Sequence, residues 1–266
     1  MFIIWGQKRK ARKLGYVADF CPICREPRAF KLSRIGSASH VYYISFGEGK
    51  LVGHIIECCD CGQALTTDPM HYPVYQPEPS PDLEYLIHET YPNLRNVYAA
   101  RLASEAQIRR SPGAISREER AKLILEPFAL LNPGVEDRFT RDTRMDKQSG
   151  IGCLGSLIVL AVCLTIALNL REPRQSQVMG AGFFLFCMGA LYTFVQLGFG
   201  PRRFLRTKIV PKIARTLDPL EPTLEEITAC LDRCKAAGMK IGQKLKPKVL
   251  WAELQRRADA EFGVVR

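Results

Sequence analysis

The sequence lacks the residue patterns that identify an enzyme. It has no serine–histidine–aspartate or cysteine–histidine arrangement, no glycine-rich phosphate loop, and no paired carboxylates in a recognisable motif. We therefore expect that the chain is not an enzyme. A catalytic role remains the weakest of three interpretations.

Charged residues are absent from two long apolar stretches, Gly150–Leu170 and Met179–Phe199. At a helical rise of about 1.5 Å per residue, each stretch reaches about 31 Å, and the hydrocarbon core of a bilayer is about 30 Å thick. The sequence therefore predicts two transmembrane helices, with a buried hairpin of a soluble core as the alternative. A pump or transporter usually keeps a charged group within the membrane, so the lack of one indicates an anchor.

Residues 171–178, between these two stretches, are predicted to form a polar bend outside the membrane, because Pro173 breaks a helix and the charges avoid lipid. Small residues in the spans would let the two helices approach closely. They are Gly152, Gly155, Ser156, Gly180, Gly182 and Gly189.

Basic residues near the span ends predict the orientation of the chain. By the positive-inside rule, both termini face the cytoplasm and the bend faces out, which in a bacterium means the inner membrane. The flanking basic residues are Arg138, Arg141, Arg144 and Lys147 before the spans and Arg202, Arg203, Arg206, Lys208, Lys212 and Arg215 after them.

The first residues do not have the features of a secretory signal. The apolar run Phe2–Trp5 is short, and basic residues follow it instead of preceding it. We expect the hairpin itself to direct insertion. Since the soluble parts are then cytoplasmic, the ten cysteines are expected to be thiols or thiolates, not disulfides.

Four cysteines form two Cys-x-x-Cys knuckles, Cys21–Cys24 and Cys58–Cys61. Such pairs are typical ligands of a tetrahedral Zn²⁺ ion, because each tight turn offers two thiolates. Pro22 suits the first turn, and Gly62 allows the positive φ that commonly closes the second. Four thiolates close the coordination shell, so the predicted zinc is structural. Unligated thiols or one redox-active pair are the alternatives.

The residues between the knuckles are predicted to form strands. Phe30 and Leu32 alternate with polar residues, and His40–Phe46 and Leu51–Glu57 follow, with a turn at Gly47–Gly49. A sheet this small buries little apolar surface, whereas structural zinc contributes roughly 10–16 kcal/mol. Cys59, His40 and His54 are more simply explained as bystanders than as ligands.

Residues 1–65 carry four features together: Phe2-Ile3-Ile4-Trp5-Gly6, Cys21-Pro22-Ile23-Cys24, the aromatic strand Val41-Tyr42-Tyr43-Ile44, and Cys58 to Cys61 followed by Gly62. They resemble a family of small bacterial zinc-ribbon proteins that begin in the same way. The resemblance implies a rubredoxin-like ribbon with zinc on Cys21, Cys24, Cys58 and Cys61, and it implies no activity. The extra Cys59 and the long membrane part depart from the short family form.

The predicted fold is a multi-domain membrane protein: a small antiparallel β zinc ribbon (1–65), a proline-rich linker (66–82), a helical segment (83–149), the transmembrane hairpin (150–170 and 179–199) and a basic helical tail (200–266). In the helical segment, a first helix is expected, with one apolar face formed by Leu94, Val97, Tyr98, Leu102 and Ala106. A second helix is expected to begin at Ser116 and to stop at Asn132–Gly134.

The tail carries +7 of the net charge of +11, counted as 15 basic and 8 acidic residues after position 200. Thr223–Glu226 is a capping box, the helix after it ends at Gly238, and Pro247 opens the next. Cys230 and Cys234 lie at core positions of the first helix.

The sequence favours a membrane-anchored scaffold or adaptor on the cytoplasmic face, whose partners are membrane lipid and a protein. The alternative is a membrane-tethered nucleic-acid-binding protein that uses the ribbon and the basic C-terminal helices. The basic run Gln7–Lys13 is expected to be a solvated strand end, or to contact lipid headgroups.

Overall fold

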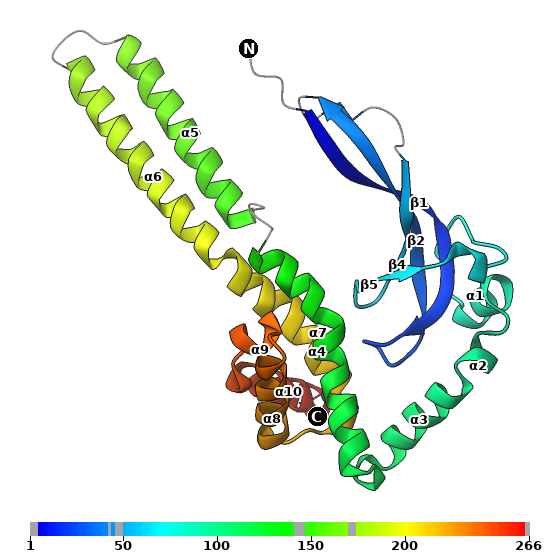
Figure 1. Ribbon diagram of the computed structural model, residues 1–266. Helices are drawn as coiled ribbons and strands as arrows, with labels where there is room; N and C mark the ends of the chain where they lie inside the picture. Colours follow the sequence, from blue (N-terminus) through cyan, green and yellow to red (C-terminus); the bar gives the residue numbers. More distant parts are fainter. Residues whose placement is uncertain (1–4, 42–43, 46–49, 141–146, 170–173, 264–266) are drawn as a thin grey trace. The chain divides into compact units, whose positions relative to one another are not determined.

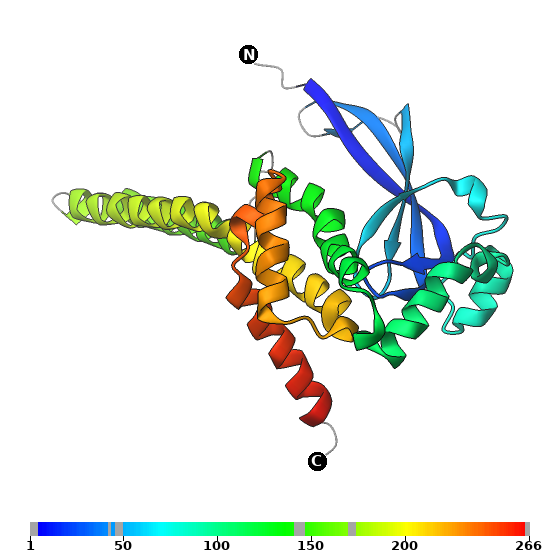
Figure 2. The same cartoon turned by 60° about the horizontal axis from the view of Figure 1, so that its bottom comes forward.

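The computed structural model describes residues 5–41, 44–45, 50–140, 147–169 and 174–263, and the chain divides into two compact units (Figures 1 and 2). Unit 1 comprises Met1–Pro127 and Lys212–Pro222, and unit 2 comprises Phe128–Pro211 and Thr223–Arg266. Unit 1 therefore combines the amino-terminal half of the chain with a short piece from the tail.

Unit 1 is built on an antiparallel sheet with strand order β1-β2-β4-β5. The strands are β1 (Trp5–Cys21), β2 (Glu26–Val41), β4 (Lys50–Cys58) and β5 (Ala64–Thr67), and the short β3 (Ile44–Ser45) also pairs with β2. Alternate apolar residues of neighbouring strands lie opposite one another and are buried, as in the pairs Val17↔Phe30 and Leu32↔Ile56. The expected antiparallel sheet is confirmed.

The first strand is longer than expected. The basic run Gln7–Lys13 lies inside β1 and pairs with β2, where it was expected at the end of a shorter strand. The predicted turn Gly47–Gly49 and part of the aromatic strand, residues 42–43, lie outside the described residues.

The proline-rich segment 66–82 packs on β1. Tyr16 and Gln76 exchange two backbone hydrogen bonds, of 2.7 and 2.9 Å. Gly15 permits this approach, because a Cβ there would lie 2.6 Å from the Gln76 carbonyl oxygen. Apart from the end of β5 and a 3-10 turn, η1 (Pro69–His71), the segment has no regular structure, as its prolines predict. It lies within unit 1.

Three short helices follow: α1 (Leu83–Thr90), α2 (Leu94–Val97) and α3 (Ala99–Arg110). The Asp82 carboxylate caps α1, and α1 lies beside the sheet in both views (Figures 1 and 2). Ala18 of β1 packs in a buried cluster with Leu86, Ile87 and Leu94. The expected apolar face was wrong at Val97 and at Ala106, which are both exposed. The residues do not form one continuous helix, because α2 ends at Val97 and α3 begins at Ala99.

A turn η2 (Pro112–Ala114) precedes α4 (Arg117–Thr140), which runs through both Pro127 and Pro133. The expected stop at Asn132–Gly134 was therefore wrong. Phe128, Leu131 and Val135 are all buried, so the apolar face continues past the prolines. Packing of that face outweighs the cost of the two missing backbone donors. Ser116 caps α4 as predicted, since its hydroxyl accepts from the Glu119 N–H at 3.2 Å.

Two helices in unit 2 are long and apolar enough to cross a membrane. They are α5 (Lys147–Leu168) and α6 (Arg174–Phe204), which lie side by side (Figures 1 and 2). A Cβ added at Gly182 would lie 2.4 Å from the Cβ of Cys163. A Cβ added at Gly189 would lie 2.6 Å from the Cβ of Ser156. The predicted close approach is therefore confirmed at these glycines and at Gly152, but Gly155 and Gly180 face open space.

The helical backbone does not end at the predicted boundary of 199. Helix α6 includes Pro201 and leads into a π-helical turn, η3 (Leu205–Ile209), and then α7 (Val210–Leu217) and a 3-10 turn, η4 (Asp218–Leu220). The Val210 N–H donates to the Leu205 carbonyl, one residue further back than in an α-helix. This wider turn ends two residues before Pro211, which has no backbone N–H to donate to the helix. The bend is also shorter than predicted, since α6 begins at Arg174.

The tail forms α8 (Leu224–Ala236), α9 (Lys240–Lys244) and α10 (Pro247–Gly263). The capping box of Thr223 and Glu226 is present, Gly238 takes a φ of +75°, and Pro247 begins the last helix, all as predicted. Cys230 and Cys234 are buried, as their spacing predicts. The Asn132 side chain accepts a hydrogen bond of 3.2 Å from the Ile241 N–H, which ties α4 to α9.

Candidate metal centre

The structure brings the four predicted cysteines, Cys21, Cys24, Cys58 and Cys61, into one cluster. Each offers one Sγ atom, and the four atoms lie within 4.8 Å of one another. The Sγ atoms of Cys21 and Cys61 are 3.6 Å apart, and those of Cys24 and Cys58 are 3.9 Å apart. All four thiols are free, and three are buried. The cluster is able to hold a metal ion.

The two knuckles have the same backbone form. Arg25 and Gly62, each directly after the second cysteine of its pair, have φ values of 60° and 63°. The Arg25 N–H donates to the Cys21 carbonyl at 2.7 Å, and the Gly62 N–H to the Cys58 carbonyl at 2.9 Å. Gly62 adopts this conformation without strain, as predicted, whereas an arginine does so at a cost of roughly 1–2 kcal/mol.

The four sulfur atoms perturb one another. Hydrogen bonds with Cys21 and Cys24 lower the pKa of the Cys58 thiol, and the same neighbours lower the pKa of Cys61 to about 7. The pKa of Cys24 is raised, chiefly by its hydrogen bond with Cys21. The thiols therefore share protons unevenly, and a bound cation is what would allow all four to ionise.

Residues of α7 contact both knuckles. The Thr216 hydroxyl donates to the Ile23 carbonyl at 3.0 Å, and Lys212 Nζ donates to the Gly62 carbonyl at 3.0 Å. Arg215 Nη2 lies 3.1 Å from Asp60 Oδ2. All these residues belong to unit 1. The cysteine cluster is therefore held together with a segment that follows the second long apolar helix in the chain.

Arg25 extends this arrangement into the interior. Its guanidinium is buried and lies 2.6 Å from the Glu105 carboxylate, through Nε and Oε2. Its Nη1 donates to the Thr216 carbonyl at 3.0 Å. Arg101 Nε lies 2.9 Å from the other oxygen of Glu105. The Arg25 side chain thus joins the first knuckle to α3 by a buried ion pair and to α7 by a hydrogen bond. These contacts explain why an arginine occupies the strained position.

Among the side chains that the structure describes, the remaining candidates do not join the cluster. Cys59 is exposed, and its N–H donates to the Ala29 carbonyl at 2.9 Å. His54 pairs with Arg34 in the sheet and lies four residues before Cys58 in β4. The side chain of His40 lies outside the described residues. Cys230 and Cys234 are in unit 2, within α8. The interpretation of Cys59 and His54 as bystanders fits these positions.

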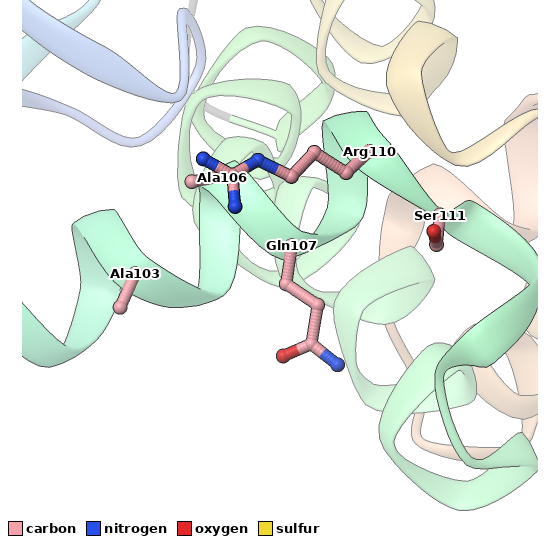
Figure 3. Close-up of a pocket in the computed structure, with 5 residues that line it drawn as sticks. All are labelled: Ala103, Ala106, Gln107, Arg110 and Ser111. Atoms are coloured by element: carbon pink, nitrogen blue, oxygen red, sulfur yellow. The ribbon is translucent and has the colours of Figure 1, made fainter.

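A hollow of about 570 Å³ lies along the end of α3 and is lined by Ala103, Ala106, Gln107, Arg110 and Ser111. Gln107 and Arg110 point to different sides of the helix (Figure 3). These side chains do not converge on a point where a substrate could be held.

Sequence reasoning missed Arg25, Glu105, Lys212, Arg215 and Thr216 as neighbours of the cluster. Thr216 is 193 residues from Ile23, and no local motif marks such a pairing. The sequence held one signal of such a contact: Arg25 follows the second cysteine of its knuckle, a position with positive φ that prefers glycine. Comparison of the chain with family models, with curated proteins and with solved structures finds no match.

Proposed function

We propose that this protein is a membrane-anchored zinc-ribbon scaffold, in which a structural Zn²⁺ ion is held by Cys21, Cys24, Cys58 and Cys61. In a tetrahedron with Zn–S bonds of 2.3 Å, neighbouring sulfur atoms lie about 3.8 Å apart. The observed separations of 3.6 and 3.9 Å fit that geometry. An all-thiolate donor set favours zinc over magnesium or calcium. The resemblance to small bacterial zinc-ribbon proteins supports the same ion.

The proposed role of zinc is structural because four thiolates leave no open coordination position. The ion would fix the two knuckles relative to each other. It would also carry the charge that allows all four sulfurs to ionise. No step of a reaction is assigned to it, and we propose no enzymatic activity.

The proposed anchor is the hairpin of α5 and α6. Exposed Phe183, Phe184 and Phe194 on α6 suit contact with lipid tails. The excess of basic residues after α6 supports a cytoplasmic location for both termini, which in a bacterium means the inner membrane.

The observation that carries the scaffold proposal is the set of hydrogen bonds from Lys212 and Thr216 to the knuckles. These residues come directly after the second apolar helix and its π turn. A metal-stabilised ribbon held on that segment would be joined to the anchor by a short stretch of chain, and its surface would then serve as a platform for a protein partner.

The test is purification of the full-length chain from membranes in two forms, Cys58→Ser and Cys59→Ser, beside the unmodified chain. A scaffold predicts a protein that co-purifies in constant ratio with the unmodified chain and with Cys59→Ser. The same protein should be lost from Cys58→Ser, although that variant still enters the membrane. Equal recovery with all three forms would contradict a metal-dependent platform.

The alternative, a membrane-tethered nucleic-acid-binding protein, draws on the charge of +7 in residues 201–266. It predicts that nuclease-sensitive RNA or DNA co-purifies with all three forms and dissociates steeply as salt rises. Ultraviolet crosslinking of the same preparations separates the two proposals. A crosslink to nucleic acid without a constant protein partner would favour the alternative.

A further inference from the structure

Helix α7 contacts both knuckles at once. The Thr216 hydroxyl donates at 3.0 Å to the carbonyl oxygen of Ile23, between the two cysteines of the first knuckle. Lys212, one helical turn earlier, donates from Nζ at 3.0 Å to the carbonyl oxygen of Gly62, directly after the second knuckle. Residues four positions apart share one face of a helix. One face of a single helix therefore holds a backbone group of each knuckle.

Sulfur atoms of different knuckles lie close together. Cys21 Sγ is 3.6 Å from Cys61 Sγ, and Cys24 Sγ is 3.9 Å from Cys58 Sγ. A tetrahedral ion therefore needs the two knuckles at a fixed separation. In the sheet, β2 pairs with β4 and places Phe30 opposite Cys58. The contacts of α7 add a second link between the knuckles, and side chains make this link.

The contact between α7 and the first knuckle is buried and runs in both directions. Arg25 Nη1 donates to the Thr216 carbonyl at 3.0 Å, while the Thr216 hydroxyl donates to Ile23. Arg25, Ile23 and Thr216 are each exposed by 2% or less. Breaking one of these hydrogen bonds inside the protein would leave a buried polar group unpaired, which is costly. We therefore expect the contact to form and break as a unit.

An ion pair joins α7 to the second knuckle as well. Arg215 Nη2 lies 3.1 Å from Oδ2 of Asp60, which stands between the two cysteines of that knuckle. Arg28 of β2 contacts the same oxygen through Nε at 3.1 Å. Since these side chains are partly exposed, solvent weakens the ion pairs. The buried hydrogen bonds of Thr216 are therefore expected to contribute more to the docking of α7.

We propose that Lys212 and Thr216 are positioning residues of the zinc centre, and that zinc occupancy controls the docking of α7 on the knuckles. The inference rests on the proposed zinc site, whose ligands remain the four cysteines. Coupling of this kind is reciprocal: if docked α7 strengthens zinc binding by some factor, bound zinc strengthens the docking of α7 by the same factor. Because α7 follows α6 through the π turn, loss of zinc would release the segment directly after the proposed anchor.

The first measurement is the zinc affinity of the full-length chain in detergent, by competition with a chromogenic chelator. The clamp variant, Lys212→Met with Thr216→Val, removes both donors. It should bind zinc about 10–100-fold less tightly, as is usual when groups that orient metal ligands are lost. The rescue variant, Lys212→Arg with Thr216→Ser, keeps both donors and should bind zinc as the unmodified chain does.

The surface control, Thr228→Val with Lys235→Met, makes the same kinds of change on α8. The Thr228 hydroxyl donates to the Leu224 carbonyl within that helix, and Lys235 is exposed. This control should keep the zinc affinity of the unmodified chain. Equal affinities in the clamp variant and the surface control would overturn the proposal. A rescue variant as weak as the clamp variant would do the same.

The second measurement is amide hydrogen exchange in the unmodified chain, with zinc bound and after its removal by a chelator. Exchange in α7 should be about 10–100-fold slower with zinc, because the coupling is reciprocal. Exchange in α8 should be the same in both states, since α8 belongs to unit 2. Rates in α7 that ignore zinc, or equal slowing in α7 and α8, would overturn the proposal.

These outcomes separate this inference from the proposed function. If the unmodified chain and the clamp variant bind zinc equally well, the role of α7 is overturned and the zinc ribbon stands. If the unmodified chain binds no zinc, both are overturned.

Discussion

The hydroxyl of Thr216 donates a hydrogen bond of 3.0 Å to the carbonyl oxygen of Ile23, which lies between the two cysteines of the first knuckle. Both residues are buried, and the same hydroxyl also contacts the Lys212 carbonyl at 3.0 Å. One side chain of the tail thus satisfies a backbone group of the cysteine cluster.

Replacing Thr216 by valine should destabilise the protein by about 1–3 kcal/mol, because the Ile23 carbonyl loses a buried donor while the shape is retained. Thermal unfolding in detergent measures this as a lower midpoint. Thr228→Val is the matched control, since its hydroxyl makes only the local bond to Leu224 on an exposed helix face. Equal midpoints for the two variants would show that the contact to the knuckle contributes nothing.

Cys58→Ser should abolish zinc binding by the full-length chain, whereas Cys59→Ser should keep one zinc ion per chain. The adjacent thiols differ because Cys58 is buried in the cluster and Cys59 is exposed outside it. Metal content after gel filtration distinguishes them. Zinc retained by Cys58→Ser and lost by Cys59→Ser would place Cys59 among the ligands.

Glu105→Gln should cost about 3–5 kcal/mol, since it leaves the buried Arg25 guanidinium without its carboxylate partner. Glu84→Gln breaks the ion pair with Arg95, which is well exposed, and should change stability by less than about 1 kcal/mol. The two thermal midpoints, measured side by side, check the difference. Similar small effects in both would mean that water reaches Arg25.

Gly189→Ala should loosen the pairing of α5 and α6, because the new methyl group would lie 2.6 Å from the Ser156 Cβ. Overpacking of this kind costs about 1–3 kcal/mol. Gly180→Ala faces open space and should be neutral or slightly stabilising, given the higher helix propensity of alanine. Thermal unfolding in the same detergent compares them, and a lower midpoint for Gly180→Ala alone would refute this helix register.

Stability should fall at alkaline pH. Burial, and then the nearby Asp19 carboxylate, raise the pKa of Tyr72 above its ordinary value of 10.0. The unfolded chain therefore loses this proton more readily than the folded one. The stabilisation is complete below about pH 10 and is lost as the pH rises above it.

Tyr72→Phe removes this group and should make the decline above pH 10 shallower. It should also lower the midpoint at neutral pH, because the Tyr72 hydroxyl donates to Asp19 at 2.5 Å. Tyr85→Phe, on an exposed ring, should change neither property. Thermal midpoints across a pH series give the result, and an unchanged alkaline slope in Tyr72→Phe would contradict it.

Local patterns in the sequence determined much of this protein. The spacing of Cys21, Cys24, Cys58 and Cys61 was sufficient to predict the cluster, because each knuckle depends on a turn of a few residues. The length and composition of the two apolar runs predicted two long helices, and the capping box at Thr223 predicted the start of α8. These features follow from short-range sterics, hydrogen bonding and hydrophobicity.

Only the tertiary structure decided the continuation of α4 through Pro127 and Pro133, the packing of segment 66–82 on β1, and the pairing of Thr216 with Ile23. In each case the local preference was weak or unfavourable, and burial of distant apolar groups or satisfaction of a buried polar group outweighed it. The sequence therefore sufficed for the cysteine cluster. The contact of that cluster with α7 depended on residues almost two hundred positions away.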